Sequence, residues 1–242
     1  LTATRSCRTT AIDLRLQTLP LLLACVYGLA YAQTPTLNAL PQGAQVISGQ
    51  ASLLQSGNLL RIQQSSPRLI TNWQSFNIGA QAGVQFVQPS ASSVALNQVL
   101  SSDPSQIFGT LSANGQVFLS NPQGVIFGPS SRIDVGGLLA TSLKLSNEDF
   151  LANRINLTQG ATAGLVKNMG QLLAQQGGYV ALIGGQVSNE GQIIAPQGTA
   201  ALASGGDVRL TIGDTGLVSV KVDTASPQAR IDQSGLIAAD GG

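Results

Sequence analysis

The side chains that most often carry out chemistry in proteins are scarce in this sequence. Histidine is absent from all 242 residues, which removes the commonest general base and the commonest metal ligand. The two cysteines, Cys7 and Cys25, both lie in a leading segment that we expect to be cleaved off. A mature chain without cysteine forms no disulfide and performs no thiol chemistry. Carboxylates are therefore the main groups left for acid–base work.

The aspartates are placed as turn residues rather than as catalytic pairs. No two of them stand at i, i+2 spacing, no Gly-Gly-x-Gly-x-Asp repeat occurs, and Glu148-Asp149 is the one adjacent acidic pair. Seven aspartates are interpreted as turn residues, and most of the seven stand beside Gly, Ser or Pro, which are typical of turns; the seven are Asp103, Asp134, Asp207, Asp214, Asp223, Asp232 and Asp240. We therefore expect no catalytic residue, no metal site and no cofactor, and a protein that is not an enzyme.

The charge pattern argues against nucleic acid as a partner. The formal net charge is +1, and only 10% of the residues are charged. Arg5, Arg8 and Arg15 gather in the leading segment, so the remainder is close to neutral and has no basic patch. Nucleic-acid binding needs clustered Lys and Arg that displace counterions from the phosphates.

Residues 1–32 have the three parts of a secretory signal peptide. The arginines form a basic start, an apolar stretch follows at residues 19–30, and Ala30 and Ala32 form a small-x-small cleavage site before Gln33. The apolar stretch is too short to span a bilayer, which takes about 20 residues. The sequence therefore predicts a secreted chain cleaved after Ala32. No second long apolar run follows, so we expect no membrane anchor in the mature chain.

Two other interpretations of this leading segment stay open. One is an N-terminal core helix, although no amphipathic period continues into the stretch with Gln, Thr and Pro that follows. The other is a lipoprotein signal, because Leu22-Leu23-Ala24-Cys25 resembles a lipobox. Cleavage there would leave the apolar residues 26–32 on the mature chain.

The mature chain repeats itself at a fixed period. Residues 168–177 align with residues 189–198 at an offset of 21 residues. A third copy, residues 234–241, begins 44 residues further on, which we interpret as about two periods. Each copy joins short apolar strands through small residues and glycine-containing turns. Such strands are too short to bury a core alone, so the repeat predicts coils whose parallel strands stack about 4.8 Å apart.

This stacking predicts an all-β solenoid, a parallel β-helix of about 20–22 residues per coil. Residues 33–70 are expected to form an N-terminal β cap, and residues 71–242 to form the coils, the last one cut short. Asn168 and Asn189 would stack and share their amides. Residues 142–156, where charge concentrates, would be a short helix or an excursion from the solenoid. The competing folds are an all-β sandwich with strands every 8–12 residues and a leucine-rich repeat.

The most specific motif lies between two apolar strands. In Asn121-Pro122-Gln123-Gly124-Val125, Asn at i, Pro at i+1 and Gly at i+3 specify a type I turn. The motif is similar to the Asn-Pro-Asn-Gly-Ile motif in the secretion domain of two-partner-secretion exoproteins, the filamentous haemagglutinin and high-molecular-weight adhesin family. Gln123 and Val125 depart from that pattern, and the Asn-Pro-Asn-Leu motif of the haemagglutinin branch is absent. The chain thus resembles the adhesin branch more closely.

Support for the resemblance extends over about residues 40–215. Residues 70–79, which include Asn72, Trp73, Phe76 and Asn77, resemble the family's Asn-Trp-x-x-Phe-Asn-Ile segment. Further matches, in order, are residues 84–86, 97–99, 107–119 and 168–198. We expect Trp73 and Phe76 to pack under the cap or to anchor a partner. The motif at 121–125 is expected to be a coil corner, a contact for a transporter, or both.

The resemblance implies a fold, a route and a function. The fold is a right-handed parallel β-helix with a capped N-terminus. The family's N-terminal domain is recognised by the periplasmic domains of a dedicated outer-membrane β-barrel transporter. It crosses that pore unfolded and folds outside a Gram-negative cell, at the base of a large adhesin-like or haemagglutinin-like exoprotein. A host-cell or bacterial surface receptor is the partner implied for the exported protein.

A second function class stays open beside the secretion domain. Many β-helical proteins are polysaccharide lyases or hydrolases, which gather Asp and Arg from successive coils. Sequence spacing does not reveal such clustering across coils. An open groove lined by several Asp and Arg would favour a polysaccharide lyase or hydrolase. A surface without such a groove would favour a secretion domain that acts by binding its transporter.

Overall fold

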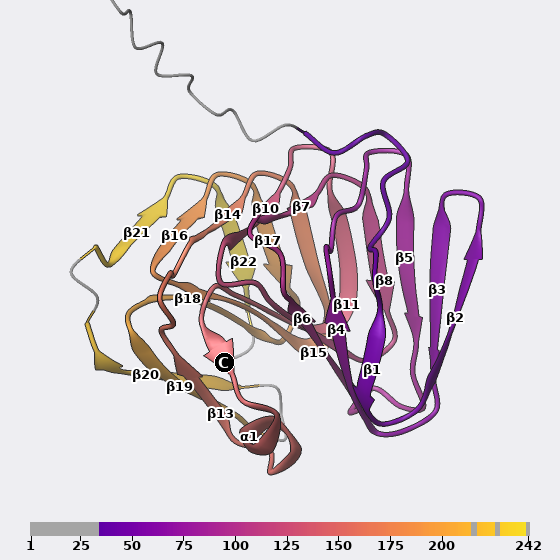
Figure 1. Ribbon diagram of the computed structural model, residues 1–242. Coiled ribbons are helices and arrows are strands. Elements are labelled where there is room, and N and C mark those ends of the chain that lie inside the picture. Colours follow the sequence, from indigo (N-terminus) through magenta and orange to yellow (C-terminus); the bar gives the residue numbers. More distant parts are fainter. Residues whose placement is uncertain (1–33, 214–216, 226–227, 241–242) are drawn as a thin grey trace, which may run out of the picture. The chain divides into compact units, whose positions relative to one another are not determined.

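The computed structural model describes residues 34–213, 217–225 and 228–240, and these form β-strands with one short helix (Figure 1). The expected signal peptide and its cleavage site at Ala30, Ala32 and Gln33 lie outside the described residues. Within those residues, no helix is long and apolar enough to cross a membrane.

Three walls of parallel strands wind into a right-handed β-helix. In the first wall, each strand pairs in parallel with the strand of the next coil. Its members are β3 (Leu59–Gln64), β5 (Gly83–Val87), β8 (Thr110–Ala113), the starts of β11 (Arg132–Thr141) and β15 (Gln171–Gly184), β17 (Gln192–Ala195) and β22 (Leu236–Ala239). This confirms the predicted fold class.

The other two walls follow the same rule. The second wall comprises β4 (Arg68–Trp73), β6 (Val94–Val99), β9 (Gln116–Ser120), the ends of β11 and β15, and β18 (Thr199–Ser204). The third comprises β7 (Ser105–Ile107), β10 (Gly124–Phe127), β14 (Leu165–Asn168), β16 (Gln186–Asn189) and β21 (Arg230–Gln233). Apolar side chains from all three walls point inward and form one continuous buried core.

The predicted offset of 21 residues is confirmed, but the interpretation of the third copy is wrong. Asn168 pairs with Asn189 in neighbouring coils. Asn189 then pairs directly with Gln233, so the 44 residues between them make one coil and not two. The extra length is an excursion that leaves the solenoid after β18 and returns at β21.

Two excursions together build a small antiparallel sheet outside the solenoid, in the order β12-β13-β19-β20. We call it the excursion sheet. The first excursion contains β12 (Lys144–Leu145), α1 (Asn147–Leu151) and β13 (Ile155–Thr158), and the second contains β19 (Asp207–Ile212) and β20 (Val218–Thr224). Residues 142–156, which were expected to form a short helix or an excursion, therefore contain a helix within an excursion. Ser146 begins the helix, because its hydroxyl accepts a hydrogen bond from the Asp149 amide.

A second hydrophobic core lies between the outer face of the second wall and the excursion sheet. The wall contributes Phe118 and Tyr179 among others, the excursion sheet contributes Leu157 and Leu210, and the helix α1 contributes Phe150. The second wall is therefore buried on both faces, and its strands β4, β6 and β9 are buried at almost every position. Figure 1 shows α1, β13, β19 and β20 grouped together beside the solenoid.

Antiparallel strands cover the N-terminal end of the solenoid. β1 (Gln45–Ser48) pairs with β4, and β2 (Ala51–Ser56) pairs with β3. Parallel pairing already begins at β3 and β4, so the first coil includes residues that the sequence suggested for the cap. Antiparallel edge strands close a parallel sheet that would otherwise expose unpaired backbone groups.

A row of side-chain amides, two buried and one exposed, connects three successive coils of the third wall. The Nδ2 of Asn168 donates to Oδ1 of Asn189 over 2.8 Å, and the Nδ2 of Asn189 donates to Oε1 of Gln233 over 2.9 Å. Asn168 and Asn189 are fully buried. The predicted sharing of amides between these two residues is confirmed.

Replacing Asn189 with alanine is expected to lower the free energy of unfolding by about 1–3 kcal/mol, because the buried amide of Asn168 loses one of its two acceptors and Gln233 loses its donor. Urea unfolding followed by circular dichroism measures this change. Gln176→Ala is the matched control, since the Gln176 amide also donates to a residue 21 positions ahead, Gln197, but on the exposed surface. It should change stability by less than about 0.5 kcal/mol. Equal losses in the two variants would contradict the role of the buried amides.

Candidate functional site

The motif at residues 121–125 forms the corner between β9 and β10. The Gly124 amide donates to the Asn121 carbonyl over 2.9 Å, which closes a β-turn, and the Gln123 amide donates to Oδ1 of Asn121 over 3.0 Å. Asn121 is fully buried, whereas Pro122 and Gln123 are partly exposed. Asn121 therefore shapes the turn from inside the molecule.

Asn121 also ties this corner to its neighbours. Its Nδ2 donates to the Asp103 carbonyl and to Oγ of Ser105, each over 3.0 Å, and its backbone amide donates to Thr141 over 3.0 Å. The side chain thus joins two coils without contacting solvent. Alanine at this position would leave several of these groups without partners.

Position 124 requires glycine, both because of its backbone conformation and because of the atoms around it. Its φ is +119°, a region that residues with a side chain rarely adopt. A Cβ atom at this position would lie 2.6 Å from the Leu165 carbonyl oxygen of the next coil. Val125, the next residue, is fully buried in the inner core. The corner therefore leaves only Pro122 and Gln123 within reach of another molecule.

The second candidate segment, residues 72–77, lies in the first coil. Trp73 and Phe76 are each 1% exposed and meet edge to face, with ring centroids 5.3 Å apart. The indole Nε1 of Trp73 donates to Oδ1 of Asn97 over 2.9 Å. Both rings belong to the inner core together with Leu40 from the chain that precedes β1. In the folded domain they are inaccessible to a partner.

The strand β7 lies between the two candidate segments and hydrogen-bonds to both. Oδ1 of Asn77 accepts a hydrogen bond from the Gln106 amide over 2.8 Å, and Asn121 bonds to Ser105 on the same strand. Asn72 is partly buried, and its Oδ1 has no hydrogen-bond partner among the described residues. Sequence reasoning missed Ser105 and Asn97, because their roles depend on which coils are neighbours.

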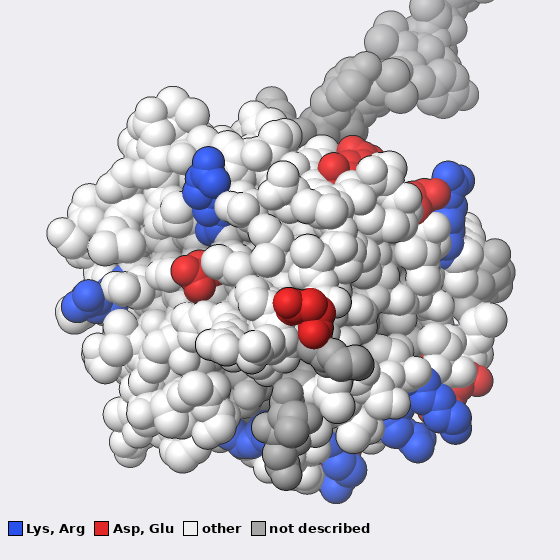
Figure 2. All heavy atoms as spheres, turned by 180° about the vertical axis from the view of Figure 1, so that it is seen from behind, with Lys and Arg blue, Asp and Glu red and all other residues white. Residues whose placement is uncertain are grey.

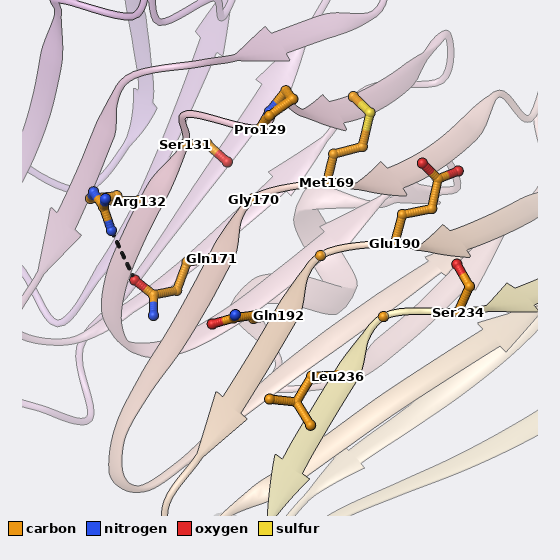
Figure 3. A pocket seen from close by; sticks show the side chains of 12 residues that line it. Pro129, Ser131, Arg132, Met169, Gly170, Gln171, Glu190, Gln192, Ser234 and Leu236 are labelled. Carbon is orange, nitrogen blue, oxygen red and sulfur yellow. Dashed lines mark hydrogen bonds between the residues drawn. The ribbon is translucent and has the colours of Figure 1, made fainter.

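The four main hollows that the described residues form contain few carboxylates. Figure 3 shows one beside a column of corner glycines, with Arg132 and Glu190 on opposite sides of it. Glu190 pairs with Lys167 over 2.7 Å, and Arg132 bonds to Gln171. None of the four main hollows brings two carboxylates together. Among the described residues, no group of three His, Cys, Asp or Glu could hold a metal ion.

Charged side chains are sparse on the face seen in Figure 2. Most of these side chains stand apart from one another, and several Lys and Arg gather at the lower right of the view.

The comparisons with known proteins agree with this architecture. Residues 37–241 match the TPS secretion domain, where TPS stands for two-partner secretion. A heme/hemopexin-binding protein of Haemophilus influenzae strain Rd is 38% identical over 162 residues, which is 66% of this chain. A second protein of that name from Haemophilus influenzae is 36% identical over 140 residues, which is 57% of this chain. The aligned parts make up only 18% and 15% of the two relatives.

Two solved structures share the fold. The HMW1 secretion domain from Haemophilus influenzae superposes with a TM-score of 0.79 at 34% identity, covering 84% of this chain and 54% of that one. The filamentous hemagglutinin secretion domain superposes with a TM-score of 0.55 at 21% identity, covering 81% of this chain and 76% of that one. The second likeness supports the fold alone.

Domains of this family are recognised by a cognate outer-membrane transporter and are exported through the periplasm to the surface or surroundings of Gram-negative bacteria. The family match covers most of the chain. In the fold, residues 121–125 form a corner of the β-helix and residues 72–77 form part of its core. The chain belongs to the TPS secretion-domain family, and its function is to direct a large exoprotein to secretion.

Proposed function

We propose that the transporter binds residues 72–77 and 121–125 of this chain before they fold. After export, the same residues form a core segment and a corner of the β-helix. One observation carries the proposal: Trp73, Phe76 and Asn121 are at most 1% exposed in the folded domain. A partner can reach these side chains only while the chain is extended. Aromatic residues such as Trp73 are strong anchors when a partner desolvates them.

The neutral, cysteine-free character of the chain after residue 32 supports this route. An extended chain that holds no disulfide can pass through a pore, and short coils with local contacts can form one after another as the chain emerges. The folded domain then serves as the base on which further coils of the exoprotein stack. The strand β22 offers a parallel edge for the next coil.

The exoprotein as a whole is proposed to be a surface-exposed binding protein. The relatives described above include proteins named for heme and hemopexin binding and a secretion domain named for HMW1. Two activities follow from these names: capture of a host protein, and adhesion to a host-cell or bacterial surface receptor. Because this chain corresponds to less than a fifth of the curated relatives, the residues for either activity would lie outside it.

Binding to the isolated periplasmic domains of the cognate transporter tests the proposal. Chain diluted freshly from denaturant should bind at least about tenfold more tightly than chain that has been refolded first, because only the former exposes Trp73 and Phe76. A peptide of residues 70–79 should compete, and the same peptide with both aromatic residues replaced by alanine should not. Equal binding by the refolded chain would refute recognition before folding.

A further inference from the structure

The largest of the four main hollows lies where the excursion sheet meets the outer face of the second wall. We call it the excursion pocket; its volume is about 700 Å³, within the range of small-molecule sites. Its apolar lining includes Val94, Phe118, Ile155 and Leu210, which are all buried members of the second core. Most of the surface of these four side chains is already covered, and the partly buried Ile212 adds exposed apolar surface to the lining.

Three arginines line this pocket, and no Asp or Glu does. Arg154 and Arg209 are more than half exposed and already pair with carboxylates outside the lining, Arg154 with Asp149 over 2.8 Å and Arg209 with Asp223 over 3.5 Å. Their charge is thus partly balanced. Both remain long, flexible side chains that can turn toward an anion in the pocket.

Arg68 differs from the other two arginines because it is half-buried and has no carboxylate partner within the described residues. Its Nη1 donates to the Phe150 carbonyl over 2.7 Å, its Nη2 donates to Oδ1 of Asn153, and its guanidinium lies 4.8 Å from the centre of the Phe150 ring. Burial lowers the pKa of this guanidinium below its usual range. A half-buried cation with neutral partners alone is incompletely compensated.

Neighbouring polar groups can also donate into the pocket. The hydroxyl of the buried Tyr179 donates to Oε1 of Gln116 over 2.7 Å, which fixes the orientation of that amide. The Nε2 of Gln116 is thereby left without an acceptor among the described residues, and Gln116 lines the pocket. A guanidinium with unused N–H groups and an amide N–H together suit a carboxylate or phosphate oxygen.

We propose that the excursion pocket binds an anionic amphiphile, with its carboxylate or phosphate at Arg68 and its hydrocarbon chain against Ile212 and the parts of Val94 and Leu210 that line the pocket. A free fatty acid and an outer-membrane phospholipid share this chemistry. The anion would compensate the charge of Arg68, and the chain would cover apolar side chains that line the hollow. This site is separate from the 72–77 and 121–125 segments and does not depend on their role in recognition.

Calorimetric titration of the whole chain with decanoate tests the proposal. We expect saturable binding at one site per chain, with octanoate about tenfold weaker because it lacks two methylene groups. Decanol, which has no charge, and inorganic phosphate, which has no chain, should each bind at least about tenfold more weakly than decanoate. Absence of saturable decanoate binding, or equal binding of phosphate alone, would overturn the proposal.

Variants locate the site. Arg68→Gln should weaken decanoate at least about tenfold, and Arg209→Gln, at an exposed position, should weaken it about threefold while leaving the fold intact. Arg61→Gln is the matched control, because Arg61 is exposed on the first wall and bonds to Gln85 away from the pocket. Circular dichroism checks that each variant is folded. If Arg61→Gln weakens binding as much as Arg209→Gln does, the binding is nonspecific and the site is refuted.

Vesicles distinguish the two sources of the amphiphile. Flotation of the chain with phosphatidylglycerol vesicles, reduced at least about tenfold in Arg68→Gln, would assign the pocket to a membrane lipid. Binding of decanoate without flotation would assign it to a free fatty acid. Either result supports the shared chemistry, whereas flotation that Arg68→Gln leaves unchanged, together with no decanoate binding, contradicts it.

Discussion

Export of a chain that carries both Asn121→Ala and Gly124→Val is expected to fall below detection. The first substitution removes the side chain that bonds to Asp103, Ser105 and Gln123. The second places a β-branched residue at φ +119° with its Cβ 2.6 Å from the Leu165 carbonyl oxygen. Each buried group left unpaired costs about 1–3 kcal/mol, and backbone strain adds a similar amount. Together these costs approach the whole stability of an ordinary domain, about 5–15 kcal/mol.

The measurement is an immunoblot of culture medium and periplasm from cells that also produce the cognate transporter. Gly177→Val is the matched control, because Gly177 also has a positive φ, +73°, but a Cβ there meets nothing within 4 Å. That variant should be exported close to the normal level. Normal export of the double variant would show that the corner is needed neither for recognition nor for folding.

A disulfide between neighbouring coils is expected to block export in an oxidising periplasm. Gln171 and Gln192 are paired in register on the first wall, and neither belongs to the buried core. Neighbouring parallel strands lie about 4.8 Å apart, within the Cα separation that a disulfide accepts. Cysteines at both positions would therefore close a covalent loop of about 20 residues that cannot pass through a pore as a single extended strand.

Blotting of the medium with and without a reductant tests this expectation. The double-cysteine chain should accumulate in the periplasm, and export should recover at least about tenfold when a thiol reductant is added. Gln171→Cys alone is the control and should be exported normally. If the chain with a verified disulfide reaches the medium as efficiently as the single variant, it does not cross the pore unfolded.

The sequence predicted the architecture because the local rules of a coil recur along the chain. Short apolar strands, glycine corners and the offset between Asn168 and Asn189 are all local or repeated features, and each is present in the structure. The turn that begins at Asn121 could also be predicted, because the conformation of a β-turn depends on four consecutive residues. The family segments added the direction in which the coils wind.

The excursions could not be predicted from the same features. The strands β19 and β20 are as short and as apolar as coil strands, and only their antiparallel pairing distinguishes them. Coil length also varies, since Ser105 pairs with Val125 after 20 residues and Gly83 with Thr110 after 27. Without a fixed length, the sequence does not show that Asn77 and Asn121 both bond to β7, or that Arg68 meets Phe150 across 82 positions.

The two buried amides of the third wall, Asn168 and Asn189, both donate to the coil that follows them. The Nδ2 of Asn168 finds its acceptors on the coil that follows, at Asn189 and Gln192, and Asn189 in turn donates forward to Gln233. A coil that slides back would strip an acceptor from the coil before it, at a cost of about 1–3 kcal/mol. Folding of each coil therefore completes the hydrogen bonds of the coil before it, and these bonds hold the folded coil in place.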